Sequence, residues 1–145
     1  AIKRCAHFTP QNLANTAWAC ARLGWSDSPL CGAAPAPAPR ASREFAPQNI
    51  GNISWAYATL RRANQPLLAA ISAAAIRTIA EFNPQVLANT AWSFAHLQVR
   101  DDPLLEAISA QAISRISEFE QQAIGNTAWA YATLRILDAR LLESI

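Results

Sequence analysis

The side chains of this sequence best suited to binding a ligand are its arginines. The chain of 145 residues contains eleven arginines but a single lysine, Lys3, and its formal net charge is +2 at pH 7. A guanidinium group presents planar donors that grip phosphate and stack on bases, so this bias suits a nucleic-acid partner. A GC-rich, alanine-rich genome that prefers arginine codons is the alternative explanation, and the sequence leaves both open.

Residue types that perform catalysis are present, but they form no recognisable arrangement. Cys5, Cys20 and Cys31 show no CxxC spacing, and His7 and His96 lie far from any carboxylate–cysteine pattern. No glycine-rich phosphate loop occurs. We therefore predict no enzyme, no metal site, no cofactor and no small-molecule substrate. An odd number of unpatterned cysteines is typical of a reducing compartment.

The composition indicates a slim, closely packed helical chain. Hydrophobic residues make up 52%, many of them alanine, and there are only 4 glycines. Apolar runs such as "LLAAI" from Leu67 are broken by Ser, Arg or Pro, so we predict no membrane span. Because the chain lacks methionine and stops at "LLESI", inside a helical pattern, we expect a fragment of a longer protein.

A 37-residue repeat organises the chain. The stretch "FTPQNLANTAW" from Phe8 recurs as "FAPQNIGNISW", "FNPQVLANTAW" and "FEQQAIGNTAW", each 37 residues after the one before. Four copies at a fixed interval predict stacked identical helical hairpins. We expect one all-α domain over 1–145, a right-handed α-solenoid with repeats at about 8–44, 45–81, 82–118 and 119–145, the last truncated.

Each repeat is predicted to contain two helices. The first begins near residue 10, 47, 84 or 121, with proline in its first turn in three copies, and ends at the leucine at 23, 60, 97 or 134. The second opens at Pro66 or Pro103 and continues to the phenylalanine of the next repeat, as "PLLAAISAAAIRTIAEF" or "PLLEAISAQAISRISEF". In repeat 1, Pro35, Pro37 and Pro39 stand where this second helix belongs, so we expect a degenerate, extended segment over about 31–40.

A helical wheel divides the first helix into two faces. With Leu13 at zero, the predicted buried arc extends to Trp18 at roughly 140°, which makes the repeated tryptophans core anchors whose truncation costs ~3–5 kcal/mol. The opposite polar arc, at about 160° to 260°, holds Gln11, Asn15, Asn12 and Arg22. The repeated tryptophans are Trp18, Trp55, Trp92 and Trp129.

The polar arc contains constant and variable positions. The constant asparagine sits in mid-helix, where asparagine is a poor choice unless its amide is satisfied. We favour an asparagine ladder that bridges adjacent repeats, and the alternative is a clamp that contacts every nucleotide of an RNA alike. The constant asparagines are Asn15, Asn52, Asn89 and Asn126.

The sequence pattern "PQxLANTAWAxAxL" followed by "DxPLLxAI" resembles that of the octotricopeptide repeat family and of the related heptatricopeptide repeats. These are helical-hairpin RNA-binding proteins of chloroplasts and mitochondria, and the likeness covers about residues 8–145 except the second half of repeat 1. The resemblance implies that the first helices line a concave groove, that each unit contacts about one nucleotide, and that the protein is located in the chloroplast or the mitochondrion.

Candidate binding residues follow from this arrangement and from the wheel. A position that varies within a fixed frame can distinguish one nucleotide from the next, so the variable positions of the first helices are the candidates for base contacts. They are Asn12, Asn49, Val86 and Ala123, and four residues later Thr16, Ile53, Thr90 and Thr127 are possible neighbours. The candidates for phosphate contacts are Arg22, Arg61, Arg62, Arg100 and Arg135.

Two functions remain open at the level of sequence. The leading hypothesis is a non-catalytic RNA-binding module that acts in transcript stabilisation, processing or translation, or that binds single-stranded or ribosomal RNA. The alternative is a protein–protein interaction scaffold, or a subunit of a large organellar assembly such as the ribosome or a photosynthetic or respiratory complex. The near-neutral charge and the apolar Val86 and Ala123 at candidate base positions favour this alternative.

Overall fold

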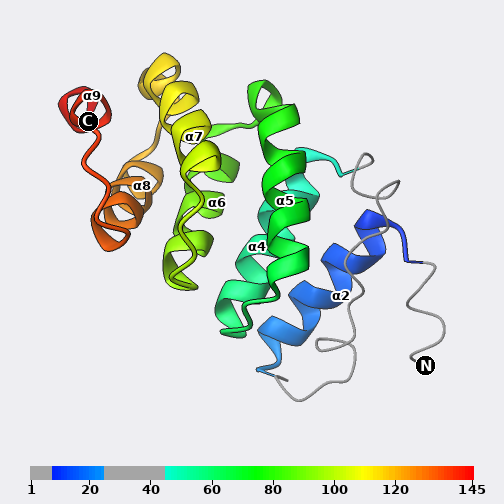
Figure 1. The fold of residues 1–145 in the computed structure, drawn as a ribbon. Helices are drawn as coiled ribbons and strands as arrows, with labels where there is room; N and C mark the ends of the chain where they lie inside the picture. The colour runs from blue at the N-terminus through cyan, green and yellow to red at the C-terminus, as the bar shows by residue number, and fades with distance from the viewer. Residues whose placement is uncertain (1–7, 25–44) are drawn as a thin grey trace.

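All secondary structure of the described residues, 8–24 and 45–145, is helical in this computed structural model (Figure 1). This confirms the all-α prediction for that part of the chain. Within the same residues, no helix has both the length and the apolar content needed to cross a membrane. The α-helices are α2 (Pro10–Arg22), α4 (Pro47–Thr59), α5 (Gln65–Thr78), α6 (Pro84–His96), α7 (Asp102–Ser114), α8 (Gln121–Thr133) and α9 (Ala139–Ser144).

The helices begin where the local sequence signals predict. The side chain of Thr9 accepts a hydrogen bond from the Asn12 amide at 3.2 Å, and Asn83 accepts one from Val86 at 2.8 Å. The proline that follows each cap has no amide hydrogen to leave unsatisfied. The second helices are capped by residues 37 positions apart, namely Asn64, Asp101 and Asp138.

The second helices are shorter than predicted. We expected each to continue to the phenylalanine of the next repeat, but α5 and α7 end earlier and are followed by short 3-10 turns, η2 (Ile79–Glu81) and η3 (Ile116–Glu118). Arg115, just after α7, donates from Nη1 to the carbonyl of Phe82 at 2.5 Å, which fixes this end of α7 to the segment before α6. The degenerate segment predicted over 31–40 lies outside the described residues.

Every first helix ends in the same backbone motif. A leucine C-cap is followed by a residue in the left-handed region, and in α4 the Arg61 amide bonds to Ala58 and the Arg62 amide to Tyr57. This is a Schellman ending, which usually uses glycine because only glycine adopts a positive φ without strain. The left-handed residues are Gly24 (φ 63), Arg61 (φ 53), Gln98 (φ 56) and Arg135 (φ 55).

The helices form two layers. α2, α4, α6 and α8 pack side by side in chain order, while α5 and α7 cover one side of this row, in front of α4 and α6 in Figure 1. Neighbouring first helices contact one another far more extensively than neighbouring second helices do. The core between the layers includes one phenylalanine from the start of each of repeats 2 to 4, Phe45, Phe82 and Phe119.

The central first helices are buried on three sides, and this corrects the helical wheel. α4 and α6 each have a first helix on both flanks and second helices behind, so only a narrow strip remains open. The wheel assumed a single covered face. Along α4 and α6, apart from their first proline, the positions that are not buried are Gln48, Asn52, Trp55 and Thr59, and Gln85, Asn89, Trp92 and His96.

Candidate nucleic-acid interface

The open strips of the first helices carry side chains in a fixed order. On α2 they are Gln11, Asn15, Trp18 and Arg22, with spacings of four, three and four that keep them on one side of the helix. The Gln11 Nε2 donates to Asn15 Oδ1 at 3.0 Å. Because the four first helices lie side by side, the strips form one surface, which we call the open face. It has a glutamine row, an asparagine row and a tryptophan row.

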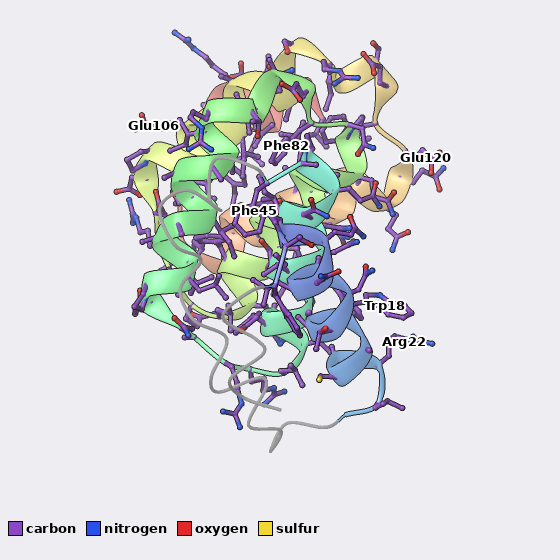
Figure 2. The ribbon with its side chains drawn as sticks, turned by 90° about the vertical axis from the view of Figure 1, so that its right-hand side faces the viewer. Trp18, Arg22, Phe45, Phe82, Glu106 and Glu120 are labelled. Carbon is purple, nitrogen blue, oxygen red and sulfur yellow. The ribbon has the colours of Figure 1, made fainter. Side chains whose placement is uncertain are left out.

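The tryptophan row lies at the surface, so the prediction of core anchors is wrong for its two ends. Trp18 is 47% exposed and Trp129 is 45% exposed, while Trp55 and Trp92 are half-buried. The tryptophan position lies on the open strip, where no neighbouring helix covers it. In Figure 2, Trp18 projects on the opposite side of the ribbon from Glu106 of α7, with Phe45 and Phe82 between them.

The tryptophans contact one another and basic side chains. The Trp92 ring stacks on His96 with centroids 4.8 Å apart, and it lies 6.2 Å from the Trp129 ring at a tilt of 32°. The guanidinium carbon of Arg22 lies 5.9 Å from the centre of the Trp18 ring, within the range of a cation–π contact. A cation therefore lies against the row at its α2 end, and an aromatic cluster lies at its α6–α8 end.

The candidate arginines lie in different surroundings. Arg22, Arg61 and Arg135 are exposed at or just after the C-terminal ends of first helices, and we call this border the arginine edge. Arg62 is half-buried. The Arg100 Nε lies 2.6 Å from Asp102 Oδ1, so a carboxylate already balances its charge. The arginine edge joins the tryptophan row through a hollow of about 420 Å³ that Arg61, His96 and Trp129 help to line.

The structure buries most of the predicted base-contacting residues, and these predictions are wrong. Asn49 and Val86 are 4% and 7% exposed, because their side of the helix faces the preceding first helix. Thr90 and Thr127 are almost fully buried, and their hydroxyls donate to backbone carbonyls of their own helices at 2.7 Å. Ile53 is fully buried as well. Asn12 is exposed, and Thr16 and Ala123 are half-buried.

The expected bridge between repeats is made by a different asparagine. The Asn49 Nδ2 donates to Gln11 Oε1 at 2.8 Å, from α4 to α2, and its Oδ1 accepts from the Ala46 amide at the start of α4. The constant Asn15 instead accepts from Gln11 of its own helix. Its counterparts, Asn52, Asn89 and Asn126, are half-buried.

The variable position packs between neighbouring first helices. Asn49 bridges to α2, whereas Val86 packs against α4, where its Cγ1 lies 3.5 Å from the point that a Cβ on Gly51 would occupy. Ala123 is the smallest residue at this register. Beside it, a polar pocket of about 240 Å³ opens between α6 and α8.

Two carboxylates lie just before α8, at the end of the open face away from the arginine edge. The Arg115 Nε and Nη2 donate to the two oxygens of Glu118 at 3.0 and 2.5 Å, and this pairing lowers the pKa of Glu118 and raises the pKa of Arg115. Glu120 occupies the N-cap position of α8, but its side chain makes no capping bond. In Figure 2 it projects on the same side of the molecule as Trp18 and Arg22.

Comparison with known proteins adds no relative: no family model matches this chain, and a search of the curated proteins returns no match.

Proposed function

We propose that this chain is a non-catalytic, organellar helical-repeat module that binds single-stranded RNA across its open face. The observation that carries the proposal is the surface row of tryptophans with arginines and a histidine beside it. Proteins that bind single strands combine aromatic platforms for the bases with a positive border that follows the backbone. The open face has both, on helices that recur at a fixed interval.

The charge at the ends of the first helices defines how a strand would lie across the open face. The carbonyl ends of the first helices carry a partial negative charge, so phosphates need the side chains of Arg22, Arg61 and Arg135 there. The bases then stack on the tryptophans, and their edges meet the asparagine and glutamine rows. Adjacent packed helices are roughly 8–10 Å apart, which supports about one nucleotide for each repeat as the strand crosses them.

The proposal includes an α-solenoid architecture, which would support the same surface. The first helices contact one another more extensively than the second helices do, which favours a superhelix whose first-helix layer is concave. Its right-handed sense is part of the proposal. A concave face collects contacts from successive repeats along one extended ligand. The location in a chloroplast or mitochondrion belongs to this proposal through the resemblance of the repeats alone.

A protein partner is the competing occupant, because exposed tryptophans also anchor protein–protein interfaces. Two features favour RNA. Arginine stands at two left-handed positions that glycine would occupy without strain, and a strained residue that is kept points to a use for its side chain. In addition, the three rows are repeated from helix to helix, as suits a ligand made of repeated units.

The proposal is tested by the anisotropy of a fluorescently labelled, mixed-sequence single-stranded RNA at several salt concentrations. The wild type should bind, with affinity falling as salt rises. Trp18→Ala and Trp129→Ala should each weaken binding between about 5-fold and 150-fold, the range for one base stacked on an aromatic ring.

Ile76→Ala is the matched control, because Ile76 is 39% exposed but lies on α5, in the other layer. It should leave RNA affinity unchanged. A wild-type protein that shows no RNA binding even at low salt would overturn the proposal in favour of the protein scaffold.

A further inference from the structure

A pocket opens at the junction of α6 and α8. At the other two junctions of first helices, a larger side chain fills the equivalent space. At the α4–α6 junction Val86 reaches Gly51, and at the α2–α4 junction the Asn49 amide reaches Gln11. At the α6–α8 junction the same register holds Ala123, opposite Ala88, and both line the pocket. The side chain of Ala123 is smaller than those of Asn49 and Val86, and this explains why the space is open here.

The lining of this pocket is polar and can both donate and accept hydrogen bonds. The amides come from the glutamine and asparagine rows of two adjacent helices, and the carboxylates come from the segment before α8. These residues are Gln85, Asn89, Gln122, Asn126, Glu118 and Glu120. An amide offers donors and acceptors, whereas an ionised carboxylate only accepts.

The two carboxylates differ in how far they are already used. Both oxygens of Glu118 accept from Arg115, which keeps this group ionised and holds it in place. Glu120 lines the pocket and makes no capping bond to α8, so its carboxylate is available there as an acceptor without that competitor. A ligand group that enters here meets acceptors at one end and amides along its sides.

Size and position restrict the ligand further. A cavity of roughly 150 Å³ accommodates a benzene-sized ring, so a pocket of about 240 Å³ accommodates one small heterocycle with its polar substituents. Asn89 and Asn126 lie one helical turn before Trp92 and Trp129. A ring that stacks on this part of the tryptophan row therefore has its polar edge directed to the pocket.

We infer that the α6–α8 pocket receives a cytosine base of the bound strand, and this inference rests on the RNA-binding function proposed above. Cytosine carries an exocyclic amino group that donates to a carboxylate. Uracil has the same size but presents a carbonyl oxygen at that position, which would face the Glu120 oxygens without a proton between them. The pocket thus distinguishes two pyrimidines of equal size by hydrogen-bond polarity.

The inference is tested with two labelled hexanucleotides, one of cytidine and one of uridine, whose dissociation constants are measured side by side. The wild type should favour the cytidine strand by about 5-fold or more, as expected for one good base contact. Ala123→Val fills the pocket as Val86 does one repeat earlier, and it should reduce this ratio to about 2-fold or less. Its affinity for the uridine strand should stay near that of the wild type.

Glu120→Gln is the second variant, because it changes an exposed side chain and leaves the packing intact. It should also reduce the cytidine preference. Val86→Ala is the matched control, since it opens space at the α4–α6 junction, where Asn83 takes the place of Glu120 in the repeat. It should leave the ratio unchanged.

The outcomes separate the two proposals. A wild type that binds neither strand contradicts the RNA-binding function itself. Binding of both strands with equal affinity, or a cytidine preference that survives in both Ala123→Val and Glu120→Gln, leaves that function standing and overturns the cytosine pocket.

Discussion

Replacing Arg61 and Arg135 by glycine should make the protein more stable and, under the proposed function, should at the same time weaken its binding to RNA. Both arginines have a positive φ, 53° and 55°, directly after the leucine C-caps of α4 and α8. The first repeat has Gly24 at the same register, with φ 63°. The backbone of this motif therefore accepts glycine, and two later repeats contain arginine in spite of the strain.

The gain in stability follows from two opposing terms. A left-handed conformation costs an L-residue roughly 1–2 kcal/mol, and this cost is relieved by glycine. Glycine in turn loses about 0.5–1 kcal/mol through the greater freedom of the unfolded chain. The difference is about 0.5–1 kcal/mol for each site, so the double variant should melt about 2–8 °C higher. The hydrogen bonds of the motif join backbone atoms and persist.

The loss in binding follows from the removal of two charges at the arginine edge. Each phosphate contact on a single strand contributes about 0.7 to the slope of log affinity against log salt, so the double variant should bind more weakly and with a slope smaller by about 1.4. Urea or thermal unfolding followed by circular dichroism measures the first effect. Anisotropy titrations at four or more salt concentrations measure the second.

Gln98→Gly separates strain from charge. Gln98 has φ 56° at the same register but is uncharged, and its Nε2 donates to the Ala95 carbonyl at 3.0 Å. This variant should be more stable than the wild type through relief of strain, although the lost hydrogen bond reduces the gain. Its slope of log affinity against log salt should equal that of the wild type. A double arginine variant that is no more stable than wild type would refute the strain argument, and an unchanged salt slope would refute the phosphate contacts.

Three further predictions concern stability. Trp18→Ala should cost no more than about 2 kcal/mol because nearly half of the ring is exposed, whereas Phe82→Ala should cost about 3–5 kcal/mol because its ring is fully buried; urea unfolding compares them. Tyr131→Phe removes a donor that bonds at 2.5 Å to a backbone carbonyl of α7, and it should lower the unfolding free energy by about 0.5–1.5 kcal/mol with an unchanged dependence on urea. A hydrogen bond from a hydroxyl of α7 and bonds from backbone amides of α9 lower the pKa of Asp138. The charge of Asp138 therefore stabilises the fold above the unfolded pKa of about 3.9, and this stabilisation is lost as pH falls through the lower folded pKa. At pH 7 the Asp138→Asn variant should have a lower free energy of unfolding than the wild type. This difference should shrink as pH falls below 4, and a difference that stays constant would contradict the charged contact.

The helix boundaries were predictable because they depend on residues close together in the sequence. Thr9 and Asn83 cap the helices that follow them, and proline begins those helices, whatever the rest of the chain does. The early end of α7 was not predictable in this way. Both α5 and α7 end before a 3-10 turn at the same repeat register, although Thr78 of α5 stands where Arg115 bonds to Phe82, so no single side chain in the sequence marks the end.

Burial could not be predicted from the wheel alone, because it depends on how many neighbours a helix has. Asn49 and Asn52 are the same residue type three positions apart on α4, but the first is buried between helices while the second lies on the open strip. Trp55 likewise lies on the strip, although its hydrophobicity predicted a core position. The sequence contained one usable signal: a tryptophan that recurs one turn from a constant polar asparagine belongs to the same edge of the helix.

The variable position has a different role from the one that its variation suggested. A side chain that changes from repeat to repeat was predicted to contact bases, but Asn49 and Val86 face the preceding helix and fill the gap between repeats. Under the proposed function, the constant glutamines, asparagines and tryptophans contact the strand, and alone they would treat every nucleotide alike. Variation at the hidden position changes the shape between two constant rows, as Ala123 does where the pocket opens. Selectivity then arises from how far the gap between each pair of first helices is filled by side chains, because a base edge can enter only where this gap remains open.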